Sequence, residues 1–177
     1  MQTGETVAQS DVARDGNGDA LTGGCQCGAV RYRAAAPLAA YACHCTECQA
    51  QSASAFGVSV VVEARSLAID GQTASWVRDE GRPTAARCTF CPRCGTRVLH
   101  AREGADRVTL KGGSLDRRAR LVPDGHIWLR SAAGWVREII GATTRPDDLL
   151  EGQPDDYRAL IDRWAARGRA RETLLGR

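Results

Sequence analysis

Eight cysteines constrain the fold of this 177-residue chain more than any other feature, because seven of them stand in three short clusters. The N-terminal segment lacks both the basic start and the apolar stretch of a secretory signal peptide, which predicts a cytoplasmic protein. Cysteines in a reducing compartment indicate metal binding before disulfide bonds. The clusters therefore predict a zinc protein that is organised around thiolate ligands.

The first and last clusters are chelating pairs, Cys25-Gln26-Cys27-Gly28 and Cys91-Pro92-Arg93-Cys94-Gly95. In the last cluster, proline rigidifies the turn and glycine permits the positive φ that closes it. Each pair offers two ligands, whereas a structural zinc ion takes four in a tetrahedron. The two pairs together predict one closed four-thiolate site, made of Cys25, Cys27, Cys91 and Cys94. The alternative is that both pairs are reduced, buried cysteines without metal.

The middle cluster packs three thiols into six residues, Cys43-His44-Cys45-Thr46-Glu47-Cys48. These thiols are close enough in sequence to ligate one metal ion from a single loop. Three protein ligands and a vacant fourth position are typical of a catalytic zinc site. We therefore predict a second zinc site with an open position at Cys43, Cys45 and Cys48.

Two alternatives stay open for the middle cluster: Cys88 or His100 closes the site as a fourth ligand, or the thiols form a redox cluster without metal. His44 lies between two ligands, so we expect its ring to point away from the metal, into solvent. Cys88 lies on a strand-like segment and is expected to be a buried free thiol that acts as a small hydrophobe.

Composition argues against two classes of protein. The formal net charge is +3 and the arginines are interleaved with acidic residues, whereas a nucleic-acid binder more often shows a basic stripe or a pI above about 9. No run approaches the ~18–20 apolar residues of a membrane span, so we expect no membrane association. Lys111 is the only lysine, a bias that we attribute to genomic composition rather than to function.

Short apolar runs separated by glycine and proline predict a mainly β, antiparallel fold. We expect strands at residues 29–33, 55–62, 75–78, 86–90, 97–100, 107–110 and 126–130. One helix is predicted from Pro154 to Gly168, where apolar residues recur at helical spacing, and the arginine-rich tail beyond it is expected to fray. We divide the chain into a flexible N-terminal tail (1–20), a zinc-binding domain (21–153) and a C-terminal helix and tail (154–177).

Four segments, in this order, resemble the glutathione-dependent formaldehyde-activating enzyme family, also called the CENP-V/GFA domain. They begin at Gly24, Cys43, Phe90 and Gly113 and read GCQCGAVRY, CHCTEC, FCPRCGT and GSLD. The resemblance implies a β-tent zinc-binding fold with two zinc ions. It also implies that the four-cysteine set is the structural site and the three-cysteine set the catalytic one. The chain departs from the family pattern at two places. The family commonly has a basic residue soon after the third cysteine of the middle cluster, where this chain has Gln49. It often has Pro-Trp where this chain has Gly134-Trp135.

The resemblance implies a carbon–sulfur lyase similar to S-(hydroxymethyl)glutathione synthase, which adds glutathione or a related thiol to formaldehyde or a similar small carbonyl. Three thiolates on Zn²⁺ leave one net negative charge, so the metal suits a sulfur ligand better than hydrolysis. We expect residues 52–57 to form a pocket wall and arginines to meet the carboxylates of glutathione. The alternative is a non-catalytic binding module in which zinc fills only the four-cysteine site.

Overall fold

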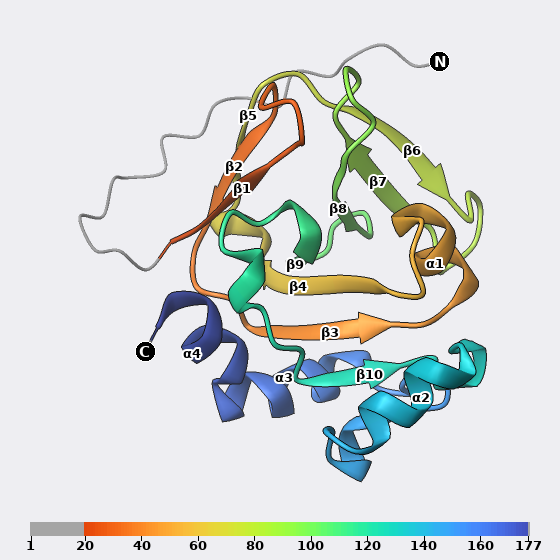
Figure 1. Cartoon of the computed structure of the whole chain (residues 1–177). Coiled ribbons are helices and arrows are strands. Elements are labelled where there is room, and N and C mark those ends of the chain that lie inside the picture. The colour runs from red at the N-terminus through yellow and green to blue at the C-terminus, as the bar shows by residue number, and fades with distance from the viewer. Residues whose placement is uncertain (1–19, 177) are drawn as a thin grey trace.

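The computed structural model describes residues 20–176, so most of the predicted N-terminal tail lies outside the described residues. The described chain forms ten strands in two sheets, together with four α-helices (Figure 1). The prediction of a mainly β fold with a short C-terminal helix is confirmed. Within the described part of the chain, no helix is long and apolar enough to cross a membrane.

The smaller sheet has the strand order β1-β2-β5, with β1 at Leu21–Gly24, β2 at Arg31–Ala34 and β5 at Ala68–Asp70. The larger sheet has the order β10-β3-β4-β9-β8-β7-β6. In chain order, its strands are β3 (Ala39–Cys43), β4 (Gly57–Glu63), β6 (Ala74–Arg78), β7 (Ala86–Phe90), β8 (Arg97–Ala101), β9 (Arg107–Lys111) and β10 (Gly125–Ile127). Neighbouring strands are antiparallel except for β10, which pairs with β3 in parallel.

The helices are α1 (Thr46–Ser52), α2 (Gly134–Gly141), α3 (Tyr157–Arg167) and α4 (Arg169–Leu175). Short 3₁₀ segments occur at Ala64–Ser66, Gly112–Ser114, Arg118–Arg120, Leu129–Ser131 and Pro146–Asp148. In Figure 1, α3 and α4 lie beneath β3, and α1 lies beside the start of β4.

Each predicted strand overlaps an observed one, whereas β1, β3 and β5 were not predicted. Strand β3 reads AAYAC and all five of its side chains are buried, so it lacks the alternation that marks a half-exposed strand. The strand predicted at residues 126–130 ends early, because Trp128 takes a left-handed conformation with φ of 64°. The parallel pairing of β10 also departs from the expected antiparallel pattern.

The larger hydrophobic core lies between the two sheets. Val60 and Leu110 face it from the larger sheet, and Tyr32 faces it from the smaller one. Helix α4 adds Ala170 and Leu174, which are 1% and 0% exposed. The prediction that the chain frays beyond Gly168 is therefore wrong, because apolar residues among the arginines pack α4 into this core.

Helix α3 covers the opposite face of β3 and β4. Alternate residues of a strand point to opposite faces, so Tyr41 and Val61 pack against Ile161 and Trp164 of this helix rather than into the inter-sheet core. The predicted apolar stripe of the helix therefore faces the sheet.

The ends of α3 follow ordinary capping rules. The Asp156 carboxylate accepts a hydrogen bond of 2.8 Å from the backbone N–H of Ala159, so the helix begins at Tyr157 rather than at Pro154. Gly168 ends it in a left-handed conformation with φ of 69°, as predicted.

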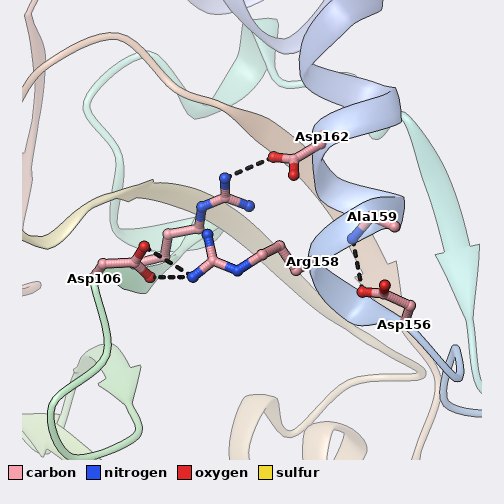
Figure 2. A network of polar contacts seen from close by, with 6 residues as sticks. Asp106, Asp156, Arg158, Ala159 and Asp162 are labelled. Atoms are coloured by element: carbon pink, nitrogen blue, oxygen red, sulfur yellow. Dashed lines mark hydrogen bonds and ion pairs between the residues drawn. The ribbon is translucent and has the colours of Figure 1, made fainter.

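Ion pairs connect α3 to the start of β9 (Figure 2). Arg158 donates hydrogen bonds of 2.7 and 2.8 Å to the two carboxylate oxygens of Asp106. Arg107 donates one of 2.6 Å to Asp162. Exposed pairs of this kind contribute only about 0.2–1 kcal/mol each. They orient the helix, while burial of its apolar face supplies most of the stability.

Trp164 of α3 is fully buried and tied to its surroundings by polar and aromatic contacts. Its indole N–H donates a hydrogen bond of 2.8 Å to Asp148, whose other carboxylate oxygen accepts one of 2.6 Å from Arg167. Its ring stacks on Tyr41 with the ring centroids 6.3 Å apart. Trp164 thus joins α3, β3 and the segment after α2.

We expect Trp164→Ala to lower the free energy of unfolding by about 3–5 kcal/mol, because it leaves a cavity and removes the hydrogen-bond donor of buried Asp148. Trp135→Ala is the matched control, since Trp135 is 58% exposed and its loss should cost less than about 0.5 kcal/mol. Urea unfolding of the two variants measures the difference. Equal losses would contradict the packing role of Trp164.

Asp124, just before β10, is a buried acid with an incomplete set of partners. Its side chain is 1% exposed. One carboxylate oxygen accepts a hydrogen bond of 2.8 Å from the backbone N–H of Ala40, and the other has no partner among the described residues. Burial raises the pKa of Asp124 to about 6 from its ordinary 3.8. The folded protein therefore binds a proton here more tightly than the unfolded chain does.

A raised acid pKa means that stability falls as the pH rises from the unfolded to the folded pKa, here from about 4 to 6. We expect Asp124→Asn, which cannot ionise, to gain stability relative to wild type across this range. After allowance for solvent screening, the gain should be on the order of 1–2 kcal/mol. Unfolding titrations of both proteins at pH 4 and pH 7 test this, and a difference that is independent of pH would contradict it.

Candidate metal centre

The fold brings Cys25, Cys27, Cys91 and Cys94 together, although the two pairs lie more than sixty residues apart in sequence. The four sulfur atoms all lie within 4.8 Å of one another. The first pair follows β1 and the second follows β7, so this cluster links the smaller sheet to the larger one.

Backbone turns aim these sulfurs at one point. The N–H of Val30 donates a hydrogen bond of 3.2 Å to the sulfur of Cys25. Gly95 has φ of 72°, the conformation that closes the turn after Cys94. The Thr96 hydroxyl lies 3.2 Å from the sulfur of Cys94, and its hydrogen bond lowers the pKa of Cys94 to about 5. The hydrogen bonds to Cys25 and to Cys94 therefore stabilise thiolates rather than thiols.

The spacing of the sulfurs fits a tetrahedral zinc ion. Zinc–sulfur bonds of about 2.3 Å require tetrahedral sulfurs to lie about 3.8 Å apart. Sulfur–sulfur distances are 3.5 Å for Cys25–Cys27 and 3.8 Å for Cys27–Cys91. The donor set suits zinc as well, because it consists of four thiols and hydrogen bonds to Cys25 and Cys94 favour their ionised forms.

The fold also brings Cys43, Cys45 and Cys48 together, with their sulfurs within 4.8 Å of one another and those of Cys43 and Cys45 3.5 Å apart. The three do not share a single loop. Cys43 is the last residue of β3, Cys45 is the N-cap of α1, and Cys48 lies inside that helix. Among the described residues, no other histidine, cysteine or carboxylate joins this group.

Cys45 has two roles in this arrangement. Its sulfur accepts a hydrogen bond of 3.4 Å from the backbone N–H of Cys48, which caps the first turn of α1. Hydrogen bonds from the Cys43 and Cys48 thiols lower the pKa of Cys45 to about 2. The hydrogen bond between Cys43 and Cys45 raises the pKa of Cys43. The cluster therefore favours a thiolate at Cys45.

Gly57 provides the space that α1 needs. It pairs with Cys43 across β3 and β4. A Cβ atom at this position would lie 3.2 Å from the Cβ of Cys48 and 3.1 Å from the side-chain nitrogen of Gln51. A larger residue would push α1, and Cys48 with it, away from Cys43.

His44 is buried, which contradicts the expectation of a solvated ring. It is 0% exposed, and its Nε2 lies 3.0 Å from Nδ1 of His126. Burial is the main cause that lowers the pKa of His44 to about 4, so the ring is neutral at pH 7. Phe56 packs on the ring with the centroids 5.2 Å apart. The partner, His126, lies too far along the chain for the sequence to reveal it.

Gln49 fixes the backbone of the cluster. Its side-chain amide donates hydrogen bonds of 2.7 Å to the carbonyl of His44 and 2.8 Å to that of Ser131. Gln49 therefore ties the cysteine cluster to the segment before α2.

The segment at residues 52–57 has internal contacts that the sequence did not indicate. The Ser52 hydroxyl donates to the carbonyl of Cys48 at 2.7 Å and approaches that of Phe56 at 3.1 Å. These contacts close the end of α1. The pocket wall expected at residues 52–57 stays a prediction.

Cys88 and His100, the two candidate fourth ligands, form a cross-strand pair between β7 and β8. Cys88 is 0% exposed, as expected for a buried thiol. The Nδ1 atom of His100 is buried without a hydrogen-bond partner among residues 20–176. Neither residue belongs to the described ligand groups.

A family model described as "Glutathione-dependent formaldehyde-activating enzyme" matches residues 20–131, more than half of the chain. The protein belongs to this family. Both cysteine clusters lie inside the matched region, and α3 and α4 lie beyond it. Family membership confirms the resemblance inferred from the cysteine motifs.

Comparison with curated proteins gave no match. Among solved structures, the crystal structure of a Rhodobacter sphaeroides protein is 22% identical, with 54% of this chain and 87% of that chain covered and a TM-score of 0.43.

We expect Cys91→Ser to lower the melting temperature by roughly 10 °C or more, because a lost ligand removes zinc-binding energy that also counts as folding energy. Cys48→Ser should have a much smaller effect, since its cluster joins only β3 and α1. Calorimetry of the zinc-loaded proteins measures both.

Cys88→Ser is the matched control for this comparison, because Cys88 and Cys91 are both 0% exposed. It separates the loss of a ligand from the cost of a buried hydroxyl. Similar melting temperatures for the Cys88 and Cys91 variants would contradict a structural metal at the four-cysteine cluster.

Proposed function

We propose that this protein is a zinc-dependent carbon–sulfur lyase that joins glutathione, or a related thiol, to formaldehyde or a similar small carbonyl compound. Cys25, Cys27, Cys91 and Cys94 hold a structural zinc ion in this proposal. Cys43, Cys45 and Cys48 hold a second zinc ion, at which the reaction takes place. Family membership supports the reaction class.

One observation carries the proposal: three thiols converge without a fourth protein ligand among the described residues. A zinc site with three protein ligands keeps a position for substrate, whereas a closed site of four does not. Cys43 and Cys48 are buried and Cys45 is half-buried. A substrate would therefore reach the cluster most easily from the side of Cys45.

A zinc ion bound here would supply a soft Lewis acid that favours the ionised form of a substrate thiol. In the addition, a bond forms between sulfur and the carbonyl carbon. The π electron pair of the carbonyl moves to oxygen, which takes up the proton that the thiol releases. The reverse reaction breaks the same carbon–sulfur bond.

The residues around the cluster position the ligands for this chemistry. Gln49 holds the backbone at His44, and Gly57 lets α1 approach β4. The buried neutral ring of His44 contacts Phe56 and His126, which holds the residue between Cys43 and Cys45 in place. Fixed ligands need little reorganisation during the reaction.

The test is the rate at which glutathione and formaldehyde exchange with their adduct, followed by exchange NMR on anaerobically purified, zinc-loaded protein. We expect exchange above the uncatalysed rate with wild type, and none above it with Cys45→Ser. Cys88→Ala is the control and should keep the activity, because Cys88 belongs to neither cluster.

Elemental analysis separates the enzyme from the non-catalytic alternative. We expect two zinc ions per chain in wild type and one in a folded Cys45→Ser variant. One zinc ion in both proteins, together with no acceleration of exchange, would favour a zinc-stabilised binding module instead.

A further inference from the structure

Lys111, the last residue of β9, carries a buried positive charge. Its side chain is 7% exposed. Among the described residues, only its backbone carbonyl takes part in a side-chain hydrogen bond, 2.6 Å from the Ser114 hydroxyl. No ion pair to its ammonium group is found within residues 20–176. Lys111 Nζ is not among the fully buried polar atoms that lack a hydrogen-bond partner, so the ammonium keeps some access to solvent. A poorly hydrated cation at the end of a buried side chain attracts an anion.

Strand pairing places Lys111 on the same face of the sheet as Cys43. Lys111 pairs with Ser59 of β4, and Ser59 pairs with Tyr41 of β3. Directly paired residues point to the same face, as do residues two apart in one strand. Cys43 therefore shares this face, two residues beyond Tyr41.

The Cys48 thiol lies close to the same point. It sits over Gly57, two residues before Ser59 in β4. Burial lowers the pKa of Lys111. Among the neighbouring charged groups, Cys48 has the largest effect, and it raises this pKa. Lys111 thus lies at the edge of the three-cysteine cluster.

Further basic groups lie on this face. His100 pairs with Thr109, two residues before Lys111, and its pKa is lowered by burial and by Lys111, Arg78 and Arg97. The Nε atom of Arg97 is buried without a hydrogen-bond partner in the described chain, and its guanidinium lies 5.7 Å from the Trp76 ring centroid. The basic groups therefore gather between the cysteine cluster and exposed Trp76.

The charges on this face do not balance. Arg78 lies 3.6 Å from Asp79, which offsets its charge. Three thiolates on a dication carry one negative charge, and Lys111 and Arg97 carry two positive ones. One positive charge remains before the substrate thiol binds and ionises, so the site attracts an anionic substrate.

The choice of lysine supports this interpretation. Of the 24 basic Lys and Arg residues, Lys111 is the only lysine. An ammonium is a compact point charge that fits a more confined site than the larger, planar guanidinium does, although a guanidinium also pairs well with a carboxylate. The single lysine thus occurs where a compact cation is needed.

We propose that Lys111, supported by Arg97, forms an anion-binding subsite that takes a carboxylate of the substrate thiol. This subsite deepens the proposed function and rests on it, because the thiol must be bound at the neighbouring cysteine cluster. The carboxylate orients the thiol, and Lys111 is a positioning residue rather than a catalytic one.

Calorimetric titration of the zinc-loaded protein with 3-mercaptopropionate and with 3-mercaptopropanol tests the subsite, because the two thiols differ only in the carboxylate. We expect wild type to bind the acid at least about tenfold more tightly than the alcohol, as one charge-assisted hydrogen bond provides. Lys111→Met should abolish this preference without changing the affinity for the alcohol. Lys111→Arg should restore part of it.

Arg65→Met is the control, because Arg65 has an 86% exposed side chain and pairs with Glu63. It should keep the preference of wild type. Arg97→Met gives a second, independent variant and should reduce the preference.

Equal affinity of wild type for the two thiols, or a preference that survives in Lys111→Met, would overturn the subsite. A preference for the acid in a protein that does not accelerate adduct exchange would leave the subsite standing and remove the proposed reaction. Accelerated adduct exchange without any preference for the acid would support the proposed reaction and remove the subsite. The two proposals therefore fail separately.

Discussion

The antiparallel pairing of β3, β4 and β9 is the constraint on which the rest of the structure depends. These three strands supply Val60 and Leu110 to the core between the sheets. They supply Tyr41 and Val61 to the opposite face, which packs against α3. Because paired residues share a face, the same register decides where Cys43 stands relative to Lys111. A slip of one residue in β3 would turn Cys43 to the other face of the sheet, and a slip in β9 would do the same to Lys111. Packing and chemistry are thus fixed by one set of backbone hydrogen bonds.

The two cysteine clusters belong to different layers of the molecule. Cys25 and Cys91 border the core between the sheets, whereas Cys43 and Cys48 border the core under α3. A metal ion in the first cluster would act on the contact between the sheets. A metal ion in the second would act on one strand and one short helix. This separation lets the second site change its ligands without disturbing the contact between sheets.

Sequence reasoning succeeded where the information was local and failed where it was not. The grouping of the chelating pairs followed from ligand number, since two pairs of thiols are needed for a tetrahedron. The α3 helix followed from the spacing of Leu160, Ile161 and Trp164 and from Gly168. The burial of His44 depends on His126, 82 residues away, and could not be inferred. Lys111 was visible as the only lysine, but strand register alone places it beside the cysteines.

Cys45 links the start of a helix to a ligand set, because one sulfur atom serves both. Serine is among the best N-cap residues, so a hydroxyl there could still begin α1 while offering a poor ligand to a soft metal. Helix formation and metal chemistry can therefore be separated by exchanging a single sulfur for oxygen. Such an exchange would change the three-cysteine cluster alone and leave the backbone of α1 and the four-cysteine cluster as they are.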